Sequence, residues 1–209
     1  MIRLTLFDKP ECPFCWKIRF ALFFKGLEYL EHYVDTDNKP AELLAASPKG
    51  TVPVLITPQG VLDESPVIMA WIEQQHPQPP LLHPPKAREL EYFSDKVVGV
   101  RIRDQIFMRR GSPPSEWDPN ITARCQKDWA VTLGELEGCC SDTGPWFLGE
   151  APSVADCALG ARFSLAAFYG LTGLEHYPKL ERWFTRLIAT EAWQRATPDT
   201  IRAALAQSA

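Results

Sequence analysis

The sequence lacks any long apolar run and any excess of positive charge. No apolar stretch approaches the ~18 residues that a membrane-spanning helix needs. Acidic residues outnumber basic ones, 26 to 22, and the net charge of -4 argues against a surface for nucleic acid. Internal repeats are also missing. We therefore expect small molecules or other proteins as partners, with no membrane and no nucleic acid.

We expect no secretory leader from the first residues of the sequence. The first residues form neither a positively charged segment nor the apolar segment that follows one in a leader, and a strand is predicted almost from Met1. A reducing compartment therefore suits the six cysteines better, and we expect a cytoplasmic protein. With 209 residues, 45% of them hydrophobic, the chain can bury the core of one large or two small domains.

A second C-x-x-C motif is absent. Only Cys12 and Cys15 have this spacing, and the remaining cysteines are Cys125, Cys139, Cys140 and Cys157. A structural zinc site needs further ligands with similar local spacing. We therefore expect no metal site, and redox chemistry is the better interpretation of the pair.

What is present is Cys12-Pro13-Phe14-Cys15, directly after the apolar residues 2–7. This position places Cys12 where a strand passes into a helix, and a helix N-terminus stabilises an anion through its unpaired N–H groups and its dipole. Cys12 is therefore the expected nucleophile. Cys15 lies close to one helical turn further on, so its sulfur can face that of Cys12 and resolve a mixed disulfide.

The first part of the chain alternates strands and helices. The order βαβαββα follows from strands predicted at residues 2–7, 29–34, 53–57 and 61–62 and helices predicted at residues 13–25, 41–46 and 65–75. Strand-helix-strand units pair in parallel, whereas the tight turn at Pro58-Gln59-Gly60 makes the last two strands an antiparallel hairpin. The pattern predicts a small mixed sheet flanked by helices.

Proline dominates residues 76–85, where it fills five of ten positions. No regular helix crosses such a segment, so we expect a semi-rigid linker at residues 77–85 between domains at residues 1–76 and 86–209. Helical spacing after the linker predicts an all-α domain, with helices at residues 86–110, 122–139, 154–169, 179–190 and 201–206. Ser153 and Asp156 are spaced as a capping box at the start of the third of these helices.

Val52-Pro53 places a proline at the entrance of a predicted strand. A cis bond here would leave the backbone N–H and C=O of Val52 available to a peptide-like ligand that adds as a strand. An ordinary trans bond at the start of a strand is the alternative, since most X-Pro bonds are trans. Only the presence of Cys12 in the same domain favours the cis interpretation.

Glu64-Ser65 precedes Pro66 and the last helix of the first domain. Ser65 is a natural N-cap, with Pro66 as the first helical residue. Alternatively, the Glu64 carboxylate and the Ser65 hydroxyl, at the helix N-terminus, receive the ammonium and carboxylate of a free amino-acid end group. Both roles are compatible.

These motifs, followed by a proline-rich linker and a helical half, give a sequence that resembles the cytosolic glutathione transferase superfamily over essentially its whole length. The cysteine-type classes are most similar: the omega class, with C-P-F-x, and the two-domain bacterial glutaredoxin, with C-P-Y-C. The resemblance implies the glutathione transferase fold, an α/β thioredoxin-like N-terminal domain followed by an all-α C-terminal domain. It also implies a homodimer.

The resemblance assigns roles in glutathione binding. Cys12 would form a mixed disulfide with glutathione, and Phe14 would line the site beside its sulfur. The other residues would hold the tripeptide: Val52 through its backbone beside a cis Pro53, Glu64 and Ser65 at the γ-glutamyl end, and Lys39 at the glycine carboxylate.

The sequence also departs from the family pattern. Cys12 stands where most conjugating transferases have a tyrosine or serine hydroxyl, so we expect weak conjugation and instead thiol transfer on glutathionylated or disulfide substrates, with glutathione as co-substrate. Cys15 replaces the usual omega-class alanine, which points toward a dithiol enzyme. A dehydroascorbate or glutathionyl-adduct reductase acting through the same cysteine, and a non-catalytic binding protein, are the alternatives.

The helical half contains two groups of residues without an assigned role. Phe107, Met108 and Trp117 could wall an apolar pocket, but burial in the core is the more frequent outcome at helical spacing. A basic cluster is expected to form a solvated or inter-subunit face, and its members are Arg101, Arg103, Arg109 and Arg110.

Overall fold

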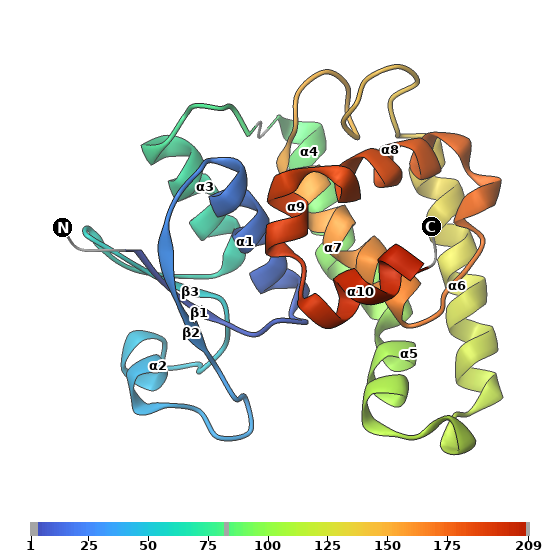
Figure 1. Ribbon diagram of the computed structural model, residues 1–209, viewed down its shortest axis with the longest axis horizontal. Coiled ribbons are helices and arrows are strands. Elements are labelled where there is room, and N and C mark those ends of the chain that lie inside the picture. Colours follow the sequence, from blue (N-terminus) through green and yellow to red (C-terminus); the bar gives the residue numbers. More distant parts are fainter. Residues whose placement is uncertain (1–3, 82–83, 208–209) are drawn as a thin grey trace. The chain divides into compact units, whose positions relative to one another are not determined.

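The computed structural model describes residues 4–81 and 84–207 (Figure 1). Contacts group the chain into two compact units: Met1–Leu81 with Glu191–Pro198, and Leu82–Thr190 with Asp199–Ala209. The break between residues 81 and 82 falls inside the proline-rich segment. A short segment near the C-terminus, residues 191–198, groups with the first unit.

A four-stranded mixed sheet forms the centre of the first unit (Figure 1). Its strands are β1 (Leu4–Asp8), β2 (Tyr29–Tyr33), β3 (Val54–Thr57) and β4 (Gly60–Asp63), in the spatial order β2-β1-β3-β4. β1 pairs in parallel with β2, and the β1–β3 and β3–β4 pairs are antiparallel. The βαβαββα order is confirmed, with α1 (Pro13–Phe24), α2 (Ala41–Ala46) and α3 (Ser65–Gln75) between and after the strands. Residues 2 and 3 of the predicted first strand lie outside the described residues.

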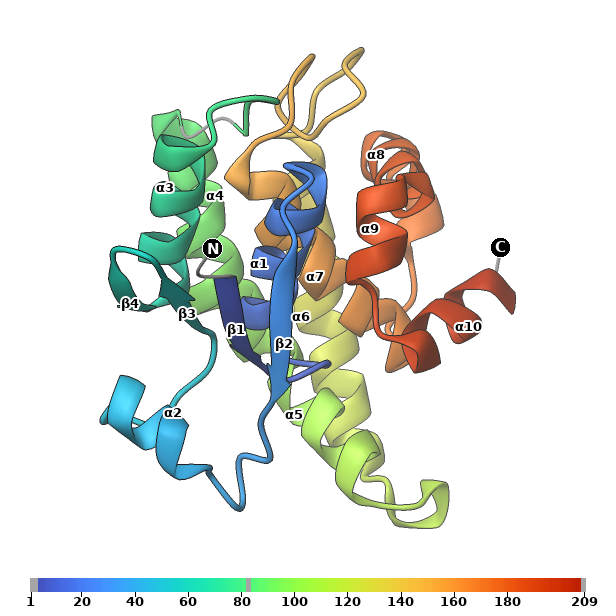
Figure 2. The same cartoon turned by 60° about the vertical axis from the view of Figure 1, so that its left-hand side comes forward.

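Both faces of the sheet are covered. Leu6 and Phe7, which are adjacent in β1 and therefore point to opposite faces, are 0% and 2% exposed. On the Phe7 face, a cluster of buried side chains includes Val54 of β3 and Leu43 of α2. α3 contacts β3, β4 and α1, and Figure 2 shows α1 and α3 beside the sheet. The sheet is therefore a rigid base for the segments that follow its strands.

A helix that the sequence pattern did not predict, α9 (Glu191–Ala196), packs on α1. The ring of Trp193 stacks on Trp16 with 5.5 Å between centroids and meets Phe20 edge-on at 5.0 Å. All three aromatic side chains are buried. This apolar contact explains why residues 191–198 group with the first unit although they lie far from it in the sequence.

The first part of the proline-rich segment is fastened to the first unit by a buried lysine. The ammonium of Lys25 donates to the carbonyl oxygens of His76 at 2.7 Å and Pro79 at 2.6 Å, and it also pairs with Glu73. The Glu73 carboxylate in turn accepts from the N–H of Leu81 at 3.1 Å. The segment up to Leu81 is thus held by hydrogen bonds, rather than merely stiffened by proline.

The regular elements of the second unit, within its described part, are helices (Figure 1), apart from an isolated bridge between Trp146 and Gly149. α4 (Pro85–Phe93) continues through one π-helical turn, η1 (Ser94–Val98), into α5 (Gly99–Gly111). The other helices are α6 (Pro119–Glu137), α7 (Val154–Phe168), α8 (Pro178–Ala189) and α10 (Asp199–Gln207), with short 3-10 turns η2 (Pro114–Glu116) and η3 (Leu174–His176). The predicted helices are confirmed, with ends that shift by a few residues.

α7 is the central helix of this unit, because α4, α5, α8 and α10 all contact it. Its residues 154–166 are buried without exception, so its apolar character extends around the helix. Phe163 lies at the centre of an aromatic cluster, with ring centroids 4.9 Å from Trp129, 5.2 Å from Trp183 and 5.6 Å from Phe184.

The predicted capping box at the start of α7 is present, and its carboxylate has further partners. Asp156 accepts from the N–H of Ser153 at 2.8 Å and from its hydroxyl at 3.0 Å. It also accepts from the N–H of Phe147 and from the indole N–H of Trp183, both at 2.8 Å. Asp156 therefore joins the preceding loop, α7 and α8, and its burial raises the pKa of the carboxyl.

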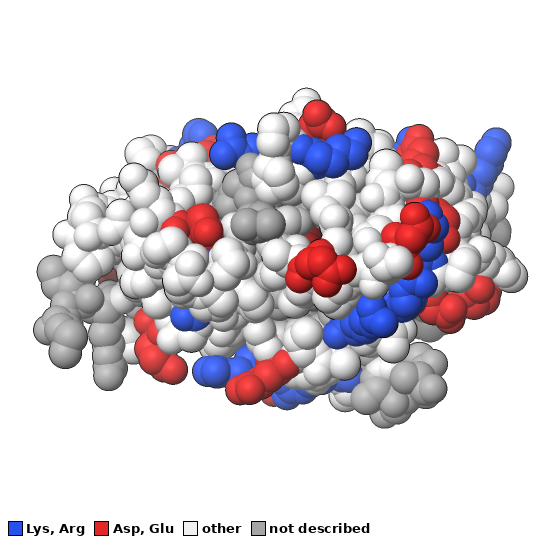
Figure 3. Space-filling model, turned by 90° about the horizontal axis from the view of Figure 1, so that it is seen from above, with Lys and Arg blue, Asp and Glu red and all other residues white. Residues whose placement is uncertain are grey.

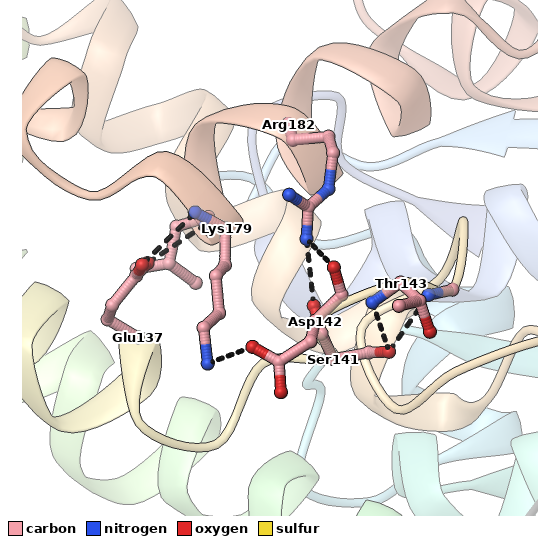
Figure 4. A network of polar contacts seen from close by, with 8 residues as sticks. Glu137, Ser141, Asp142, Thr143, Lys179 and Arg182 are labelled. Atoms are coloured by element: carbon pink, nitrogen blue, oxygen red, sulfur yellow. Dashed lines mark hydrogen bonds and ion pairs between the residues drawn. The ribbon is translucent and has the colours of Figure 1, made fainter.

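A polar network holds the loop between α6 and α7 against α8 (Figure 4). The Glu137 carboxylate accepts from the first N–H groups of α8, those of Lys179 and Leu180, both at 3.1 Å. Arg182 of the same helix donates to the carbonyl oxygens of Ser141 at 3.0 Å and Asp142 at 2.7 Å. An acidic group at a helix N-terminus and a fork-shaped donor on the loop thus fix this connection.

The surface carries charges of both signs. On the face shown in Figure 3, acidic and basic side chains are interspersed among uncharged ones. None of the helices in the described part of the chain is long and apolar enough to cross a membrane. Within residues 4–81 and 84–207, no three or more His, Cys, Asp or Glu side chains gather in a way that could hold a metal ion.

Candidate functional site

The sheet register brings the sequence motifs together at one edge. Phe7, near the end of β1, pairs with Val54 at the start of the antiparallel β3, and Val54 pairs with Asp63 at the end of β4. The segment after β1, the segment before β3 and the segment after β4 therefore all leave the sheet at the same edge. These segments carry Cys12, Val52-Pro53 and Glu64-Ser65.

Cys12 is the N-cap of α1. Its backbone is extended (φ −77°, ψ 117°), Pro13 begins the helix, and the Cys12 N–H donates to the carbonyl of Lys9 at 3.0 Å. Cys12 is partly exposed, whereas Cys15 is 0% exposed. Neither cysteine is in a disulfide, and only Cys12 is exposed enough to meet a dissolved substrate.

The pKa values of the two thiols shift in opposite directions. The hydrogen bond from the Cys15 thiol is the largest cause that lowers the pKa of Cys12 to about 7, and the N–H groups of Cys15 and Phe14 add to it against the effect of burial. Burial, and then this same hydrogen bond, raise the pKa of Cys15 well above its ordinary value. The arrangement therefore favours a thiolate on Cys12 and a proton on Cys15.

A buried ion pair supports the segment that carries Cys12. Arg19 of α1 donates from Nη1 to both carboxylate oxygens of Asp8, each at 2.7 Å, and both side chains are at most 6% exposed. Its Nη2 donates to the carbonyl of Pro10 at 2.6 Å. Its Nε donates to the carbonyl of Ala196, the last residue of α9, at 2.9 Å. The sequence analysis missed Asp8 and Arg19, because nothing in their spacing identifies partners eleven residues apart.

Asp8 has a second carboxyl neighbour. A hydrogen bond between Glu31 of β2 and Asp8 is the largest cause that raises the pKa of Glu31 to about 7. The negative charge of Asp8 also raises the pKa of both cysteines. Two carboxyl groups and one guanidinium therefore lie together at the base of the segment that carries Cys12.

The bond between Val52 and Pro53 is cis, as expected. The β1–β3 and β3–β4 ladders begin at Val54, so the backbone of Val52 takes part in neither. Lys39 lies over the loop before Val52, because a Cβ added to Gly50 would be 2.9 Å from its Cδ and 3.2 Å from its ammonium. Gly50 has a positive φ of 58°, so glycine suits this position on two grounds.

The prediction for the start of α3 is wrong by one residue. Glu64, rather than Ser65, is the N-cap, because its carbonyl accepts the first helical bonds, from the N–H groups of Val67 and Ile68. Glu64 has φ 70°, a left-handed conformation that costs a non-glycine residue about 1–3 kcal/mol and is concentrated at functional sites. Ser65 is the first helical residue and is 4% exposed.

Lys49 is a further residue of this edge that the sequence analysis missed. Its ammonium lies 2.7 Å from Oε1 of Glu64, and both side chains are more than half exposed. Such a pair contributes little to stability because water screens it. A ligand can therefore take the place of either partner. In the sequence, the position of Lys49 directly before Gly50 was the only feature that could have pointed to this lysine.

Phe14 and the three residues of the helical half have distinct surroundings. Phe14 is half-buried, and the ammonium of Lys17 lies 5.7 Å from its ring centroid. The interpretation of Phe107, Met108 and Trp117 as core residues is wrong: Phe107 is 59% exposed and the other two are only partly buried. They lie near the end of α5 and after the short turn η2, where the chain leaves the packed helices.

Two family models match the chain. One describes the N-terminal domain of glutathione S-transferases and matches residues 6–80, and the other describes their C-terminal domain and matches residues 119–186. The first match contains the sheet edge described above. The second covers α6, α7 and most of α8.

The chain is also similar in sequence to curated proteins. A stringent starvation protein A homolog of Haemophilus influenzae is 34% identical over 156 residues, which are 74% of this chain and 70% of that protein. The glutathione S-transferase DHAR3 of Arabidopsis thaliana, a chloroplastic protein, is 28% identical over 169 residues, 80% of this chain. The match spans only 58% of the length of that plant protein.

A solved structure extends the likeness to the whole fold. A glutathione S-transferase of Methylobacterium radiotolerans, in complex with glutathione sulfonate, is 26% identical, with a TM-score of 0.76 over 94% of this chain and 95% of that one. The same family is indicated by the two domain models, by the shared fold and by a relative above 30% identity. The chain belongs to the glutathione S-transferase superfamily.

Proposed function

We propose that this protein is a glutathione-dependent thiol transferase that acts through a mixed disulfide between Cys12 and glutathione. The observation that carries the proposal is the unequal pair of thiols: the Cys12 pKa is lowered to about 7, and the Cys15 pKa is raised. A thiolate near neutral pH is the nucleophile in thiol–disulfide exchange. A hydroxyl group, which conjugating relatives use, is absent from position 12.

The reaction consists of two exchanges. The Cys12 thiolate attacks the glutathionyl sulfur of a glutathionylated substrate, which forms the Cys12–glutathione disulfide and releases the substrate as a thiolate. The thiolate of a second glutathione then attacks the glutathionyl sulfur of this mixed disulfide. Oxidised glutathione leaves, and Cys12 returns as a thiolate. Since the reductant is glutathione itself, we place this chemistry in the cytoplasm.

Several groups at the sheet edge suit the glutathione tripeptide. The backbone of Val52, which lies outside the ladders, would pair with the cysteinyl unit. Glu64 and Ser65, at the N-terminus of α3, would hold the γ-glutamyl end, and this requires Glu64 to exchange its contact with Lys49 for the ligand ammonium. Lys39, above the same loop, would receive the glycine carboxylate. Phe14 would line the site beside the sulfur.

The experiment that tests the proposal is the reduction of a glutathionylated peptide, with glutathione as the sole reductant. We expect turnover by the wild type, loss of at least 100-fold in Cys12→Ser, and retained turnover in Cys15→Ser, since the monothiol route needs only Cys12. Full activity of Cys12→Ser contradicts the proposal. Absence of glutathione binding in calorimetry contradicts it too and favours a non-catalytic role.

We further propose that the protein is a homodimer. Large apolar side chains are exposed on both units: Val61 of β4 and Val67 of α3 at 47% and 52%, and Tyr92 of α4 and Val100 of α5 at 66% and 57%. Exposed apolar groups of this kind are typical of interaction surfaces. Light scattering after size exclusion should give twice the mass of the chain, and Tyr92→Glu should shift it toward the monomer. A monomer mass for the wild type at high concentration contradicts this proposal.

A further inference from the structure

Two consecutive arginines, Arg109 and Arg110, end α5, and the structure separates them from the rest of the basic cluster. Arg101 pairs with Glu135 at 2.5 Å, and Arg103 lies 3.4 Å from Asp104. Arg109 has no carboxylate partner among the residues that the structure describes. Arg109 therefore differs from Arg101 and Arg103, which each have a carboxylate partner.

The guanidinium of Arg109 lies between an aromatic ring and a glycine. Its central carbon is 4.3 Å from the ring centroid of Trp117. On another side, a Cβ added to Gly170 would be 2.1 Å from Nη1 of Arg109, so only glycine leaves room for the guanidinium. Gly170 also has φ 74°, which glycine adopts without strain.

Arg109 is partly buried, and one of its nitrogens has no partner in the described part of the chain. Its Nε is buried and has no hydrogen-bond acceptor within the described part of the chain. Burial lowers the pKa of Arg109, and no charged group contributes to that shift. A cation removed from water is normally paired, because an unpaired one is costly. An anion from outside the chain can therefore pair with Arg109 without displacing a carboxylate of the described residues.

A role in capping the helix ends does not account for Arg109. A cation near a helix C-terminus usually donates to the last carbonyl groups. Here other side chains do so: the indole N–H of Trp117 donates to the carbonyl of Ser112 at 3.0 Å, and Gln105 donates to the carbonyl of Tyr169 at 3.1 Å. The guanidinium of Arg109 is left for another acceptor.

Arg110 brings a second positive charge to the same turn. Its Nε donates to the hydroxyl of Tyr169 at 3.2 Å, and its guanidinium carbon is 5.8 Å from the ring of Tyr169 and 6.0 Å from that of Phe107. Tyr169 directly precedes Gly170, so both arginines reach the turn that follows α7. The surroundings thus combine two guanidinium groups with three aromatic rings, one of which, that of Phe107, is largely exposed.

We propose that Arg109, with Arg110, Trp117, Tyr169 and Phe107 around it, forms a binding site for a carboxylate carried on a flat aromatic or conjugated group. A guanidinium fork matches the two oxygens of a carboxylate. The aromatic side chains give a flat ligand apolar area, which a small inorganic anion could not use. The site lies wholly within the helical unit and does not depend on Cys12 or on glutathione, so it is a separate proposal from the thiol transferase activity.

The test is calorimetry of the full chain, without glutathione, with 2-naphthoate as the probe and neutral 2-naphthamide as its isostere. We expect one naphthoate per chain, with affinity that falls as salt is added and at least tenfold weaker binding of the amide. Arg109→Gln should weaken naphthoate binding at least tenfold. The matched control, Arg103→Gln on the same helix, should bind as the wild type does.

A second variant keeps the test valid if Arg109→Gln folds poorly. Arg109→Lys keeps the positive charge but loses the paired N–H donors of the guanidinium. Its naphthoate affinity should therefore lie between those of the wild type and Arg109→Gln. Circular dichroism identifies any variant that has lost its fold. Equal binding of naphthoate and naphthamide, wild-type affinity in both folded Arg109 variants, or no binding of naphthoate at millimolar concentration would each overturn the proposal.

Discussion

The Cys15 thiol donates a hydrogen bond to the sulfur of Cys12, three residues earlier at the start of α1, and this contact sets the acidity of both groups. The donor is fully buried, so it keeps its proton, whereas the acceptor is partly exposed and can react. In this arrangement Cys15 activates Cys12 even when it takes no part in exchange. The two roles of Cys15, donor and resolving thiol, can be separated by substitution.

Replacement of Cys15 by alanine should raise the pKa of Cys12 from about 7 toward its ordinary value of 9, because the largest stabilising contact of the thiolate is lost. Alkylation of Cys12 by iodoacetamide, followed by peptide mass across pH 5–10, measures this pKa. Cys15→Ser is the matched control, since its hydroxyl still donates. An alanine variant whose alkylation profile matches the wild type contradicts the assigned role of the hydrogen bond.

Removal of the Arg19 side chain should be strongly destabilising. Arg19→Ala leaves the Asp8 carboxylate buried without its cation and frees the carbonyl of Pro10, so we expect a loss of about 3–5 kcal/mol in the free energy of unfolding. Urea unfolding followed by circular dichroism measures it. Arg103→Ala, which removes an exposed arginine, should cost less than about 1 kcal/mol. Similar losses for the two variants would show that the buried pair is not a structural support.

Glu31 should make the stability of the fold depend on pH. The folded state raises its pKa from 4.5 to about 7 through the hydrogen bond with Asp8, so the folded protein holds this proton more tightly than the unfolded chain does. The resulting stabilisation is complete below pH 4.5 and is lost as the pH rises through about 7. Glu31→Gln, which does not titrate, should flatten the curve of melting temperature between pH 5 and 8.

The control for Glu31→Gln is Glu42→Gln, a substitution at an exposed position of α2. This variant should retain the decline in melting temperature that the wild type shows between pH 5 and 8. A wild-type curve that rises over this interval, relative to Glu31→Gln, has the wrong sign for a raised pKa of Glu31.

Asp156→Ala should destabilise the helical unit by at least about 3 kcal/mol, because buried donors of Phe147, Ser153 and Trp183 lose their acceptor together. Differential scanning calorimetry measures the loss. Asp142→Ala is the control, since this exposed carboxylate makes a surface pair with Lys179 that water screens, so its loss should change stability little. Equal effects of the two substitutions would contradict the central position of Asp156.

Much of the site could be predicted from the sequence because its motifs stand where regular elements begin. Cys12 and Glu64 each precede a helix, and Val52-Pro53 precedes a strand, so the order of the elements was enough to bring them to one edge. The positions of Pro13 and Pro66, each in a first helical turn, explain why both helix starts were predicted to within one residue.

What the sequence did not reveal depends on contacts between distant residues. α9 has six residues, fewer than two helical turns, so its sequence shows no clear periodicity. Only the packing of Trp193 on Trp16 shows its place. The Asp8–Arg19 pair joins the end of a strand to the second turn of a helix, and the Glu31–Asp8 contact joins two strands. Tertiary structure determines such partners, and local spacing does not.

The most direct test of the account is the mass of the intact protein after exposure to oxidised glutathione, measured on Cys15→Ser, which cannot resolve a mixed disulfide. The account predicts one glutathione per chain, located on Cys12 by peptide mapping and released again by reduced glutathione. The double variant Cys12→Ser/Cys15→Ser should acquire none under the same conditions. An unmodified Cys12 in Cys15→Ser, or an equal adduct in the double variant, would contradict Cys12 as the glutathione-linked nucleophile.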